Sequence, residues 1–223
     1  MKKILVVGNS ISAEILCAYL RCDSRYEVVG LTVDDEFVSQ GGFGGYRSVG
    51  FSAVSKAFHA DTHRVIMAVG YSDLNRTREA IFNRLKAMGY GMETYIHPDA
   101  RVYTDKPLGE GSVVLPGAVI EPSARVGANT IVWSNVTLAH HSSVDDHCWV
   151  AAGSVVSGGA RVLRNTFLGV NCTVVNDITI KEFNVVGAGA MISRDTKSHS
   201  VHLARSAEPF RYSSEDYVKH FGI

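Results

Sequence analysis

Two neighbouring histidines are the side chains of this sequence best suited to acid–base chemistry. His140 and His141 occur together in the segment Ala139-His140-His141-Ser142. An imidazole titrates near neutral pH, and its neutral form can take a proton from an amine or hydroxyl that attacks a carbon centre. The pair therefore supplies a candidate general base, with a merely solvated surface histidine as the alternative.

The same pair, together with His147, could also suggest a metal site. Zinc sites combine histidine with cysteine or carboxylate at regular spacings, and no such spacing accompanies these residues. The cysteines show no paired spacing of a metal site or a disulfide framework: Cys17, Cys22, Cys148 and Cys172. We therefore expect no metal, and free thiols favour a reduced, cytoplasmic setting.

A second group of residues indicates nucleotide binding near the N-terminus. The apolar run 3–7 ends in Gly8-Asn9-Ser10, and the β-branched run 26–33 ends in Asp34-Asp35. A glycine turn after the first strand is one part of the dinucleotide-binding pattern, and a carboxylate after the second strand can accept hydrogen bonds from a ribose or base. The full glycine pattern is missing, so we do not expect a whole NAD.

The elements that carry these residues alternate between strand and helix in the first half of the chain. Strands are predicted at 3–8, 26–33 and 65–70, and a helix at 12–21. A second helix continues through Ile81 and Leu85, and Asp73 or Asn75 could cap it. This alternation predicts a small, doubly wound, Rossmann-like α/β domain over residues 1–95.

The second half of the chain follows a strict six-residue period. Aliphatic residues occupy every sixth position from Val102 to Ile192, sixteen in succession, and the residue two places before each is usually small. This period fits neither a helix nor an alternating strand, and it is typical of a hexapeptide β-helix, in which three hexapeptides form one triangular coil. We therefore predict an all-β parallel β-helix of five coils over residues 96–197.

This register gives the histidine pair its place in the fold. Leu138 is an interior aliphatic position, so His140 and His141 follow it at a corner, where side chains point outward. The repeat then stops. In residues 198–223, the segment from Ser213 to Asp216 predicts a capped short helix, which we expect to cover the open last coil.

Composition excludes several classes of protein. Lys plus Arg equal Asp plus Glu at 22 each, so the chain lacks the basic excess of most nucleic-acid-binding proteins. No apolar run approaches the roughly 20 residues that cross a bilayer. The N-terminal apolar run is interrupted too early for a signal peptide. We expect neither a nucleic-acid partner nor a membrane span.

The combination of the two halves resembles a family of sugar acyltransferases, typified by sialic-acid O-acetyltransferases and nucleotide-amino-sugar N-acetyltransferases. The resemblance covers nearly the whole chain, and neither half alone would be specific. It rests on six segments: Asp34-Asp35, Arg78-Glu79-Ala80-Ile81, Tyr95-Ile96-His97-Pro98-Asp99-Ala100, Ser134-Asn135-Val136-Thr137-Leu138-Ala139-His140, Phe167-Leu168-Gly169-Val170-Asn171 and Val186-Gly187-Ala188-Gly189-Ala190.

The resemblance implies a left-handed β-helix, a homotrimer, and acetyl-CoA in the groove between neighbouring β-helices. It implies that His140 deprotonates a sugar amine or hydroxyl, which then attacks the thioester directly. Gly158, which follows 18 residues later, would offer its backbone N–H to the thioester oxygen. The residues along CoA would be Gly158, Gly169, Val170, Gly187 and Ala188.

The function implied by the resemblance is N-acetylation of a nucleotide-linked amino sugar in surface-polysaccharide or glycan biosynthesis. The nucleotide sugar would be held by Gly8, Asn9, Ser10, Asp34 and Asp35. O-acetylation of sialic acid or another sugar, and a non-catalytic β-helix scaffold, are the alternatives.

The side chain that orients His140 stays open at this point. Many family members carry an acidic residue directly after the histidine, where this chain has His141. The sequence offers His141, Asp145 and Asp146 as orienting partners.

Overall fold

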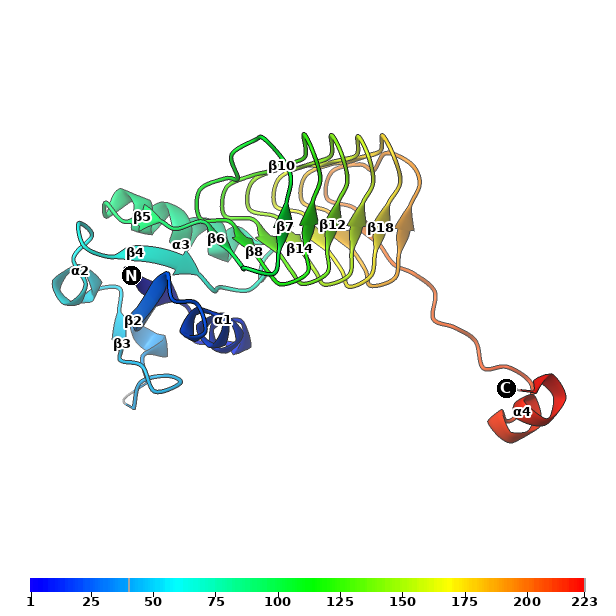
Figure 1. The fold of residues 1–223 in the computed structure, drawn as a ribbon, viewed down its shortest axis with the longest axis horizontal. Helices are drawn as coiled ribbons and strands as arrows, with labels where there is room; N and C mark the ends of the chain where they lie inside the picture. Colours follow the sequence, from blue (N-terminus) through cyan, green and yellow to red (C-terminus); the bar gives the residue numbers. More distant parts are fainter. Residues whose placement is uncertain (40, 223) are drawn as a thin grey trace.

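A computed structural model describes residues 1–39 and 41–222 and shows an α/β domain, a β-helix and a C-terminal segment (Figure 1). The α/β domain contains five parallel strands in the order β3-β2-β1-β4-β5. Its elements are β1 (Lys2–Val7), α1 (Ile11–Arg21), β2 (Tyr26–Val33), the 3₁₀ helix η1 (Asp35–Phe37), β3 (Ser48–Gly50), α2 (Val54–Ala57), β4 (Arg64–Met67), α3 (Arg76–Ala87) and β5 (Gly91–Met92). This order confirms the Rossmann-like expectation and places a crevice outside the carboxyl ends of β1 and β4.

The apolar run of β1 is buried on both sides of the sheet. Ile4 and Val6 pack on the side of α1, whereas Leu5 and Val7 pack on the side of α2 and α3. Successive strand residues point to opposite faces, so a strand covered by helices on both faces must be apolar throughout.

The β-helix is built from two-residue strands in three parallel sheets (Figure 1). The seven-stranded sheet contains β6 (Tyr95–Ile96), β8 (Val113–Val114), β11 (Ile131–Val132), β14 (Trp149–Val150), β17 (Phe167–Leu168), β20 (Val185–Val186) and β22 (Val201–His202). The six-stranded sheet contains β7 (Arg101–Val102), β9 (Val119–Ile120), β12 (Thr137–Leu138), β15 (Val155–Val156), β18 (Thr173–Val174) and β21 (Met191–Ile192). The four-stranded sheet contains β10 (Arg125–Val126), β13 (Ser143–Val144), β16 (Arg161–Val162) and β19 (Thr179–Ile180).

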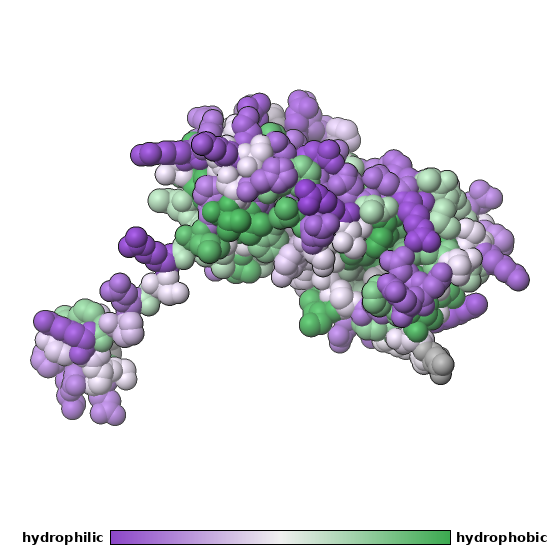
Figure 2. Space-filling view, turned by 180° about the vertical axis from the view of Figure 1, so that it is seen from behind, coloured by the Kyte–Doolittle hydropathy of each residue, from purple (hydrophilic) through white to green (hydrophobic). Residues whose placement is uncertain are grey.

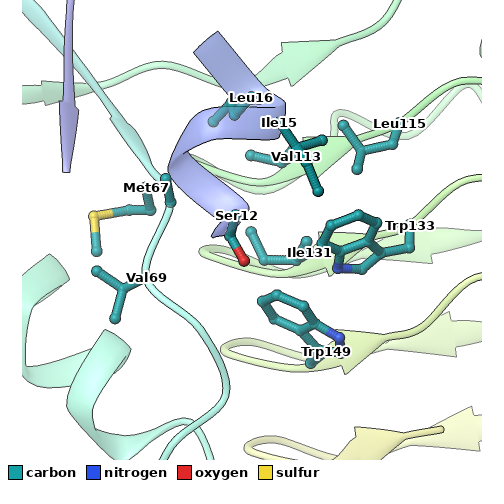
Figure 3. Close-up of a pocket in the computed structure, with 11 residues that line it drawn as sticks. Ser12, Ile15, Leu16, Met67, Val69, Val113, Leu115, Ile131, Trp133 and Trp149 are labelled. Carbon is teal, nitrogen blue, oxygen red and sulfur yellow. The ribbon is translucent and has the colours of Figure 1, made fainter. Parts of the chain in front are cut away.

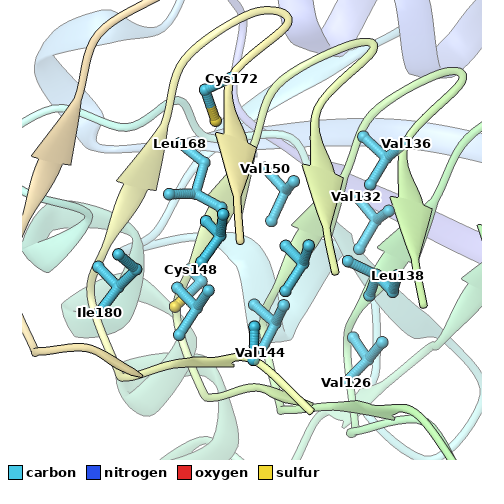
Figure 4. Close-up of a cluster of buried hydrophobic side chains, with 14 of the residues drawn as sticks. Val126, Val132, Val136, Leu138, Val144, Cys148, Val150, Leu168, Cys172 and Ile180 are labelled. Atoms are coloured by element: carbon cyan, nitrogen blue, oxygen red, sulfur yellow. The ribbon is translucent and has the colours of Figure 1, made fainter. Parts of the chain in front are cut away.

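Residues 18 apart pair in adjacent coils, as the six-residue period predicts. Leu138 pairs with Val156, for example, and Val144 pairs with Val162. Fourteen of the sixteen periodic aliphatic residues are buried; the two at the N-terminal end, Val102 and Leu108, are partly buried. Figure 4 shows the resulting column of interior side chains. The expected boundary after residue 95 falls inside β6, which already belongs to the β-helix.

The corners of the β-helix repeat a left-handed backbone conformation that the sequence analysis did not identify. Every sixth residue from Gly111 to Gly189 has a positive φ angle. Glycine adopts this conformation freely, and asparagine, aspartate and histidine adopt it more readily than other residues. His141 and His147 both occupy such positions, so turn geometry by itself accounts for a histidine at each of them.

The α/β domain packs on the outer face of the seven-stranded sheet. Leu16 of α1 belongs to the same apolar cluster as Val113 and Trp149 of the β-helix. Only a small cavity of about 20 Å³ remains between the two domains at this place (Figure 3). Tight packing of this kind fixes the two domains relative to each other.

A buried arginine strengthens this junction. The Arg78 guanidinium donates to the carbonyl oxygens of His147 (2.8 Å) and Cys148 (3.0 Å) in the β-helix, and to that of Gly70 (3.0 Å). Burial lowers the pKa of Arg78 to about 10. Asn75 precedes α3 with φ at 64°, and its side-chain oxygen accepts from Arg78 at 2.8 Å. Asn75, one of the two residues predicted to cap this helix, does occupy the N-cap position, but its side chain makes no capping hydrogen bond.

The C-terminal segment ends in α4 (Ser214–Phe221), whose first turn is capped by the Ser213 hydroxyl as predicted. The helix does not cover the last coil: it buries no side chain and lies apart from the β-helix in both views (Figures 1 and 2). Side chains close the end of the four-stranded sheet instead. The Asp195 carboxylate accepts a hydrogen bond from the N–H of Thr179, and the Thr196 hydroxyl accepts one from the N–H of Lys181.

Candidate active site

His140 lies at the corner between β12 and β13, and its ring reaches over the next coil. The side chain is exposed. A Cβ atom placed on Gly158 would lie 2.5 Å from Cε1 and 2.8 Å from Nε2 of His140. Any side chain at position 158 would therefore collide with the imidazole, and the glycine provides the space in which the ring rests.

The backbone around this ring leaves one donor free. The N–H of His140 donates to the Glu121 carboxylate at 2.7 Å, and the carbonyl of His140 accepts from Gly159 at 3.0 Å. Among the residues that the structure describes, the N–H of Gly158 has no acceptor. A free backbone N–H beside a candidate base is the arrangement that can stabilise a developing oxyanion.

Asn176 completes this column of three corner residues, and the sequence analysis did not identify it. It lies 18 residues after Gly158, and its side-chain amide donates to the Gly158 carbonyl at 3.4 Å. The same amide nitrogen would be 3.2 Å from a Cβ atom on Gly158. The 18-residue stacking of corners, applied once more beyond Gly158, would have predicted its place.

The structure distinguishes among the three candidate partners of the His140 ring. Its Nδ1 lies 3.2 Å from Nδ1 of His141. Asp146 instead accepts from the N–H of Ala128 at 2.7 Å. Asp145 lines a separate surface cavity on the four-stranded sheet, where burial and the neighbouring Asp146 raise its pKa. Of these three candidates, His141 is the one whose side chain contacts the His140 ring.

The crevice of the α/β domain contains a cavity of about 210 Å³. Four of the five predicted nucleotide-sugar residues line it: Gly8, Asn9, Ser10 and Asp34. The rest of the lining was not predicted from the sequence; it comes from the ends of β1 and β2, the 3₁₀ helix, the turn after β3, the loop after β4 and α3: Val7, Val33, Phe37, Phe51, Val69, Gly70, Ser72, Thr77 and Ile81. Loop and helix residues of this kind carry no local sequence signal.

The two adjacent carboxylates at the end of β2 have different surroundings. Asp34 lines the cavity and forms an ion pair with Arg84 at 3.0 Å. Asp35 points to the turn after β3, where its carboxylate accepts from the N–H (3.2 Å) and the hydroxyl (2.9 Å) of Ser52. Asp35 therefore holds the wall of the cavity and does not line it.

Four of the five residues expected along CoA, all except Gly158, lie at a different corner from His140. Gly169 and Val170 follow β17, and Gly187 and Ala188 follow β20, at the corner between the seven-stranded and six-stranded sheets. A Cβ atom on Gly169 would lie 2.7 Å from the backbone nitrogen of Ala188. Close contact between successive coils is thus a structural reason for this glycine.

The candidate parts of the site do not meet within one chain. The coil is a triangle, and the corner that carries His140 joins the six-stranded and four-stranded sheets. The α/β domain packs on the seven-stranded sheet, which is the opposite side of that triangle. A substrate in the cavity of one chain therefore faces away from the imidazole of the same chain.

The described residues, 1–39 and 41–222, hold no group of three or more His, Cys, Asp or Glu side chains placed to bind a metal. His147 is separated from the other two histidines: it is buried against α3, and Asn129 contacts its Nδ1 at 2.9 Å. None of the helices in this part of the chain is long and apolar enough to cross a membrane.

Comparisons with known proteins agree with this architecture. Residues 108–140 match the bacterial transferase hexapeptide family, described as six repeats. No curated protein sequence matches the chain.

Solved structures match over almost the full length. A variant of perosamine N-acetyltransferase from Caulobacter crescentus, in complex with CoA and GDP-perosamine, is 24% identical with a TM-score of 0.83, covering 92% of this chain and 94% of that one. WeeI from Acinetobacter baumannii is 17% identical with a TM-score of 0.80, covering 90% and 96%. The acetyltransferase domain of PglB from Neisseria gonorrhoeae, in complex with acetyl coenzyme A, is 24% identical with a TM-score of 0.61, covering 94% and 99%.

These matches confirm the fold class that the sequence predicts. The chain carries the hexapeptide repeat of bacterial transferases and has the fold of these solved structures, an α/β Rossmann-like domain followed by a left-handed parallel β-helix.

Proposed function

We propose that this protein is an acetyl-CoA-dependent acetyltransferase that acetylates the amino group of a nucleotide-linked amino sugar. The observation that carries the proposal is the pairing of the exposed His140 imidazole with the free N–H of Gly158 directly beneath it. The N–H without an acceptor among the described residues recurs at this corner position, for example at Ser134 and Ala152, so the imidazole over it is the feature that a scaffold protein does not need. The solved structures of the same fold that hold CoA with GDP-perosamine support the substrate class.

The chemistry needs one base and one oxyanion donor. The sugar amine attacks the carbonyl carbon of the thioester, and His140 takes the proton that the nitrogen loses as the new C–N bond forms. The Gly158 N–H donates to the oxygen on which negative charge develops. When the C–S bond breaks, CoA leaves as the thiolate, and the proton held by His140 balances that charge.

The acceptor binds in the α/β crevice. The N-terminal end of α1 and the turn residues Asn9 and Ser10 offer backbone N–H groups to the phosphates of the nucleotide, whereas the N–H of Gly8 donates to the Thr32 carbonyl. Asp34 accepts hydrogen bonds from the ribose or the base. A cavity of about 210 Å³ suits this part of the substrate and leaves the sugar projecting outward.

The active protein is a homotrimer in this proposal. Because His140 and the crevice face opposite sides of one β-helix, a second copy must bring its imidazole to the sugar. A closed ring of three prisms gives each copy the same two neighbours and leaves three equivalent grooves for CoA. Light scattering should report three times the chain mass of 24.2 kDa. A monomer that is fully active at the same concentration would contradict the shared site.

Thiol release from acetyl-CoA, measured with a panel of UDP-, GDP- and dTDP-linked amino sugars, tests the activity. Cys22 is exposed and would react with the thiol reagent, so a Cys22→Ser background keeps the signal clean. His140→Ala and His140→Asn should lower kcat by at least ~100-fold, the lower range for a positioned base. His199→Ala is a control, because His199 is also an exposed histidine of this chain.

Two outcomes would overturn the proposal. Absence of thiol release with every amino sugar would favour the scaffold, and release with hydroxyl acceptors alone would favour an O-acetyltransferase. Near-normal turnover of the His140 variants would remove the base from the mechanism while leaving the activity itself.

A further inference from the structure

The imidazole rings of His140 and His141 are hydrogen-bonded directly to each other. Their Nδ1 atoms are 3.2 Å apart, and the ring planes are inclined by 79° with centroids 5.4 Å apart. Two ring nitrogens at this distance share one hydrogen, so one ring donates and the other accepts. The direction of this bond decides whether His140 can act as a base.

Only one direction leaves His140 competent. If His141 donated, His140 would have its lone pair at Nδ1 and its proton at Nε2, so Nε2 could accept nothing. If His140 donates from Nδ1, its Nε2 carries the free lone pair. Nε2 is on the edge of the ring that rests over Gly158. The reactive nitrogen of His140 is therefore Nε2.

We propose that His141 is a positioning residue that accepts the Nδ1 hydrogen of His140 and so holds it in the tautomer with a free Nε2. This inference rests on the proposed role of His140 as the base. His141 would not touch either substrate; it acts through the neighbouring ring, as the third member of a catalytic triad does.

The backbone of both residues is fixed. The N–H of His141 donates to the carbonyl of Pro122 at 3.2 Å, and its φ angle is 60°. The N–H of His140 is held by Glu121, and its carbonyl by Gly159. Hydrogen bonds to the coils on both sides thus limit the freedom of the two rings to their side-chain torsions.

The charged residues around this corner are two carboxylates, Glu121 and Asp177, and two arginines, Arg125 and Arg161, which pair with Ser143 from the adjacent coils. Glu121 lies on the preceding coil and is used by the His140 N–H. Asp177 lies two coils beyond His141, where its carboxylate covers Gly159 of the intervening coil. Neither has a hydrogen bond to the His140 ring among the described residues, so the acceptor of its Nδ1 hydrogen is a neutral imidazole instead of a carboxylate.

A neutral histidine acceptor has a consequence that a carboxylate lacks. Protonated imidazole carries hydrogen on both nitrogens, so a protonated His141 can no longer accept from His140. Uptake of a proton by either ring then inactivates the pair. The acid limb of the wild-type rate profile should therefore be steeper, by up to one proton, than that of a variant whose acceptor cannot titrate.

Two substitutions suit the left-handed backbone at position 141. His141→Gly removes the ring without strain, and His141→Asn keeps an acceptor oxygen that does not titrate in this range. His141→Gly should lower kcat by about 10–100-fold, the range found when a hydrogen-bonding partner of a metal-bound histidine is removed, with both KM values within twofold. His141→Asn should restore most of kcat and show an acid limb with a slope lower by up to one proton.

The tautomer can be observed without any substrate. Long-range ¹H–¹⁵N correlation spectra of ¹⁵N-histidine-labelled protein at pH 8 should show His140 protonated at Nδ1 in the wild type and in His141→Asn, and at Nε2 in His141→Gly. A wild-type His140 protonated at Nε2, or unchanged kcat in His141→Gly, would overturn the inference. An Nδ1-protonated His140 whose removal leaves turnover intact would instead refute the proposed base and leave the pair standing.

Discussion

Replacing Gly158 with alanine should separate activity from stability more cleanly than any other single change in this chain. The added methyl carbon would lie 2.5 Å from Cε1 and 2.8 Å from Nε2 of His140. Carbon atoms in ordinary contact are about 3.5 Å apart. The ring must therefore shift by roughly 1 Å, and it has room to do so because the His140 side chain is exposed.

The cost should appear in the rate. A shift of about 1 Å in a reacting group can lower turnover by about 100-fold, which corresponds to roughly 2.7 kcal/mol of activation free energy. The backbone N–H of residue 158 is retained, so the loss comes from the moved imidazole. We expect kcat to fall by about 100-fold in the thiol-release assay.

The fold should be unaffected. Gly158 is not among the glycines with positive φ, and alanine already stands at the equivalent corner position in Ala128, Ala152 and Ala188. Gly→Ala at a compatible site stabilises by about 0.4–1 kcal/mol through the unfolded chain. The melting temperature of Gly158→Ala should therefore equal or slightly exceed that of the wild type.

A double variant shows whether the ring is responsible. In a His140→Ala background, Gly158→Ala should cause little further loss, because no imidazole remains to be displaced. Equal losses of turnover in both backgrounds would show that the methyl group acts on substrate or on the oxyanion donor. Full activity of the single variant would refute the placement of the ring over Gly158.

The remaining predictions concern the crevice, the domain junction and the interior. Asp34→Ala should raise KM for the nucleotide sugar without changing KM for acetyl-CoA, whereas Asp35→Ala should lower the melting temperature because it frees the Ser52 turn; equal effects of both would contradict this division. Arg78→Ala should cost about 3 kcal/mol, since it leaves several buried carbonyls without donors; the exposed Arg76→Ala is the control, and equal urea midpoints would argue against the junction. Burial raises the pKa of Cys148 to about 12, so the unfolded thiol ionises first as pH rises above about 9, and stability should fall by up to about 1.4 kcal/mol per pH unit, an effect weaker in Cys148→Ala.

The sequence by itself determined the β-helix and the corner position of His140. Coil formation depends on pairing between residues 18 apart and on one interior aliphatic residue per hexapeptide, and both are written in the period from Val102 to Ile192. The same spacing placed Gly158 one coil above His140. The repeat can be recognised in the sequence because each coil contacts only its neighbouring coils and packs the same kinds of residue in its interior.

Side-chain direction was decided by the tertiary structure. Adjacent Asp34 and Asp35 look equivalent in the sequence, yet they point to a cavity and to the Ser52 turn, because the chain bends into a 3₁₀ helix between them and the next strand. His141, Asp145 and Asp146 were equally plausible partners of His140 until the coil geometry brought one ring nitrogen within 3.2 Å.

The packing of the two domains against each other could not be predicted from local sequence patterns either. Arg78 looks like a surface residue of a polar helix, but it is fully buried because its partners, the carbonyls of His147 and Cys148, lie about 70 positions later in the chain. The same packing sets the crevice and the imidazole on opposite sides of one β-helix. Contacts between distant segments depend on how whole elements fit together, so only the folded chain reveals them.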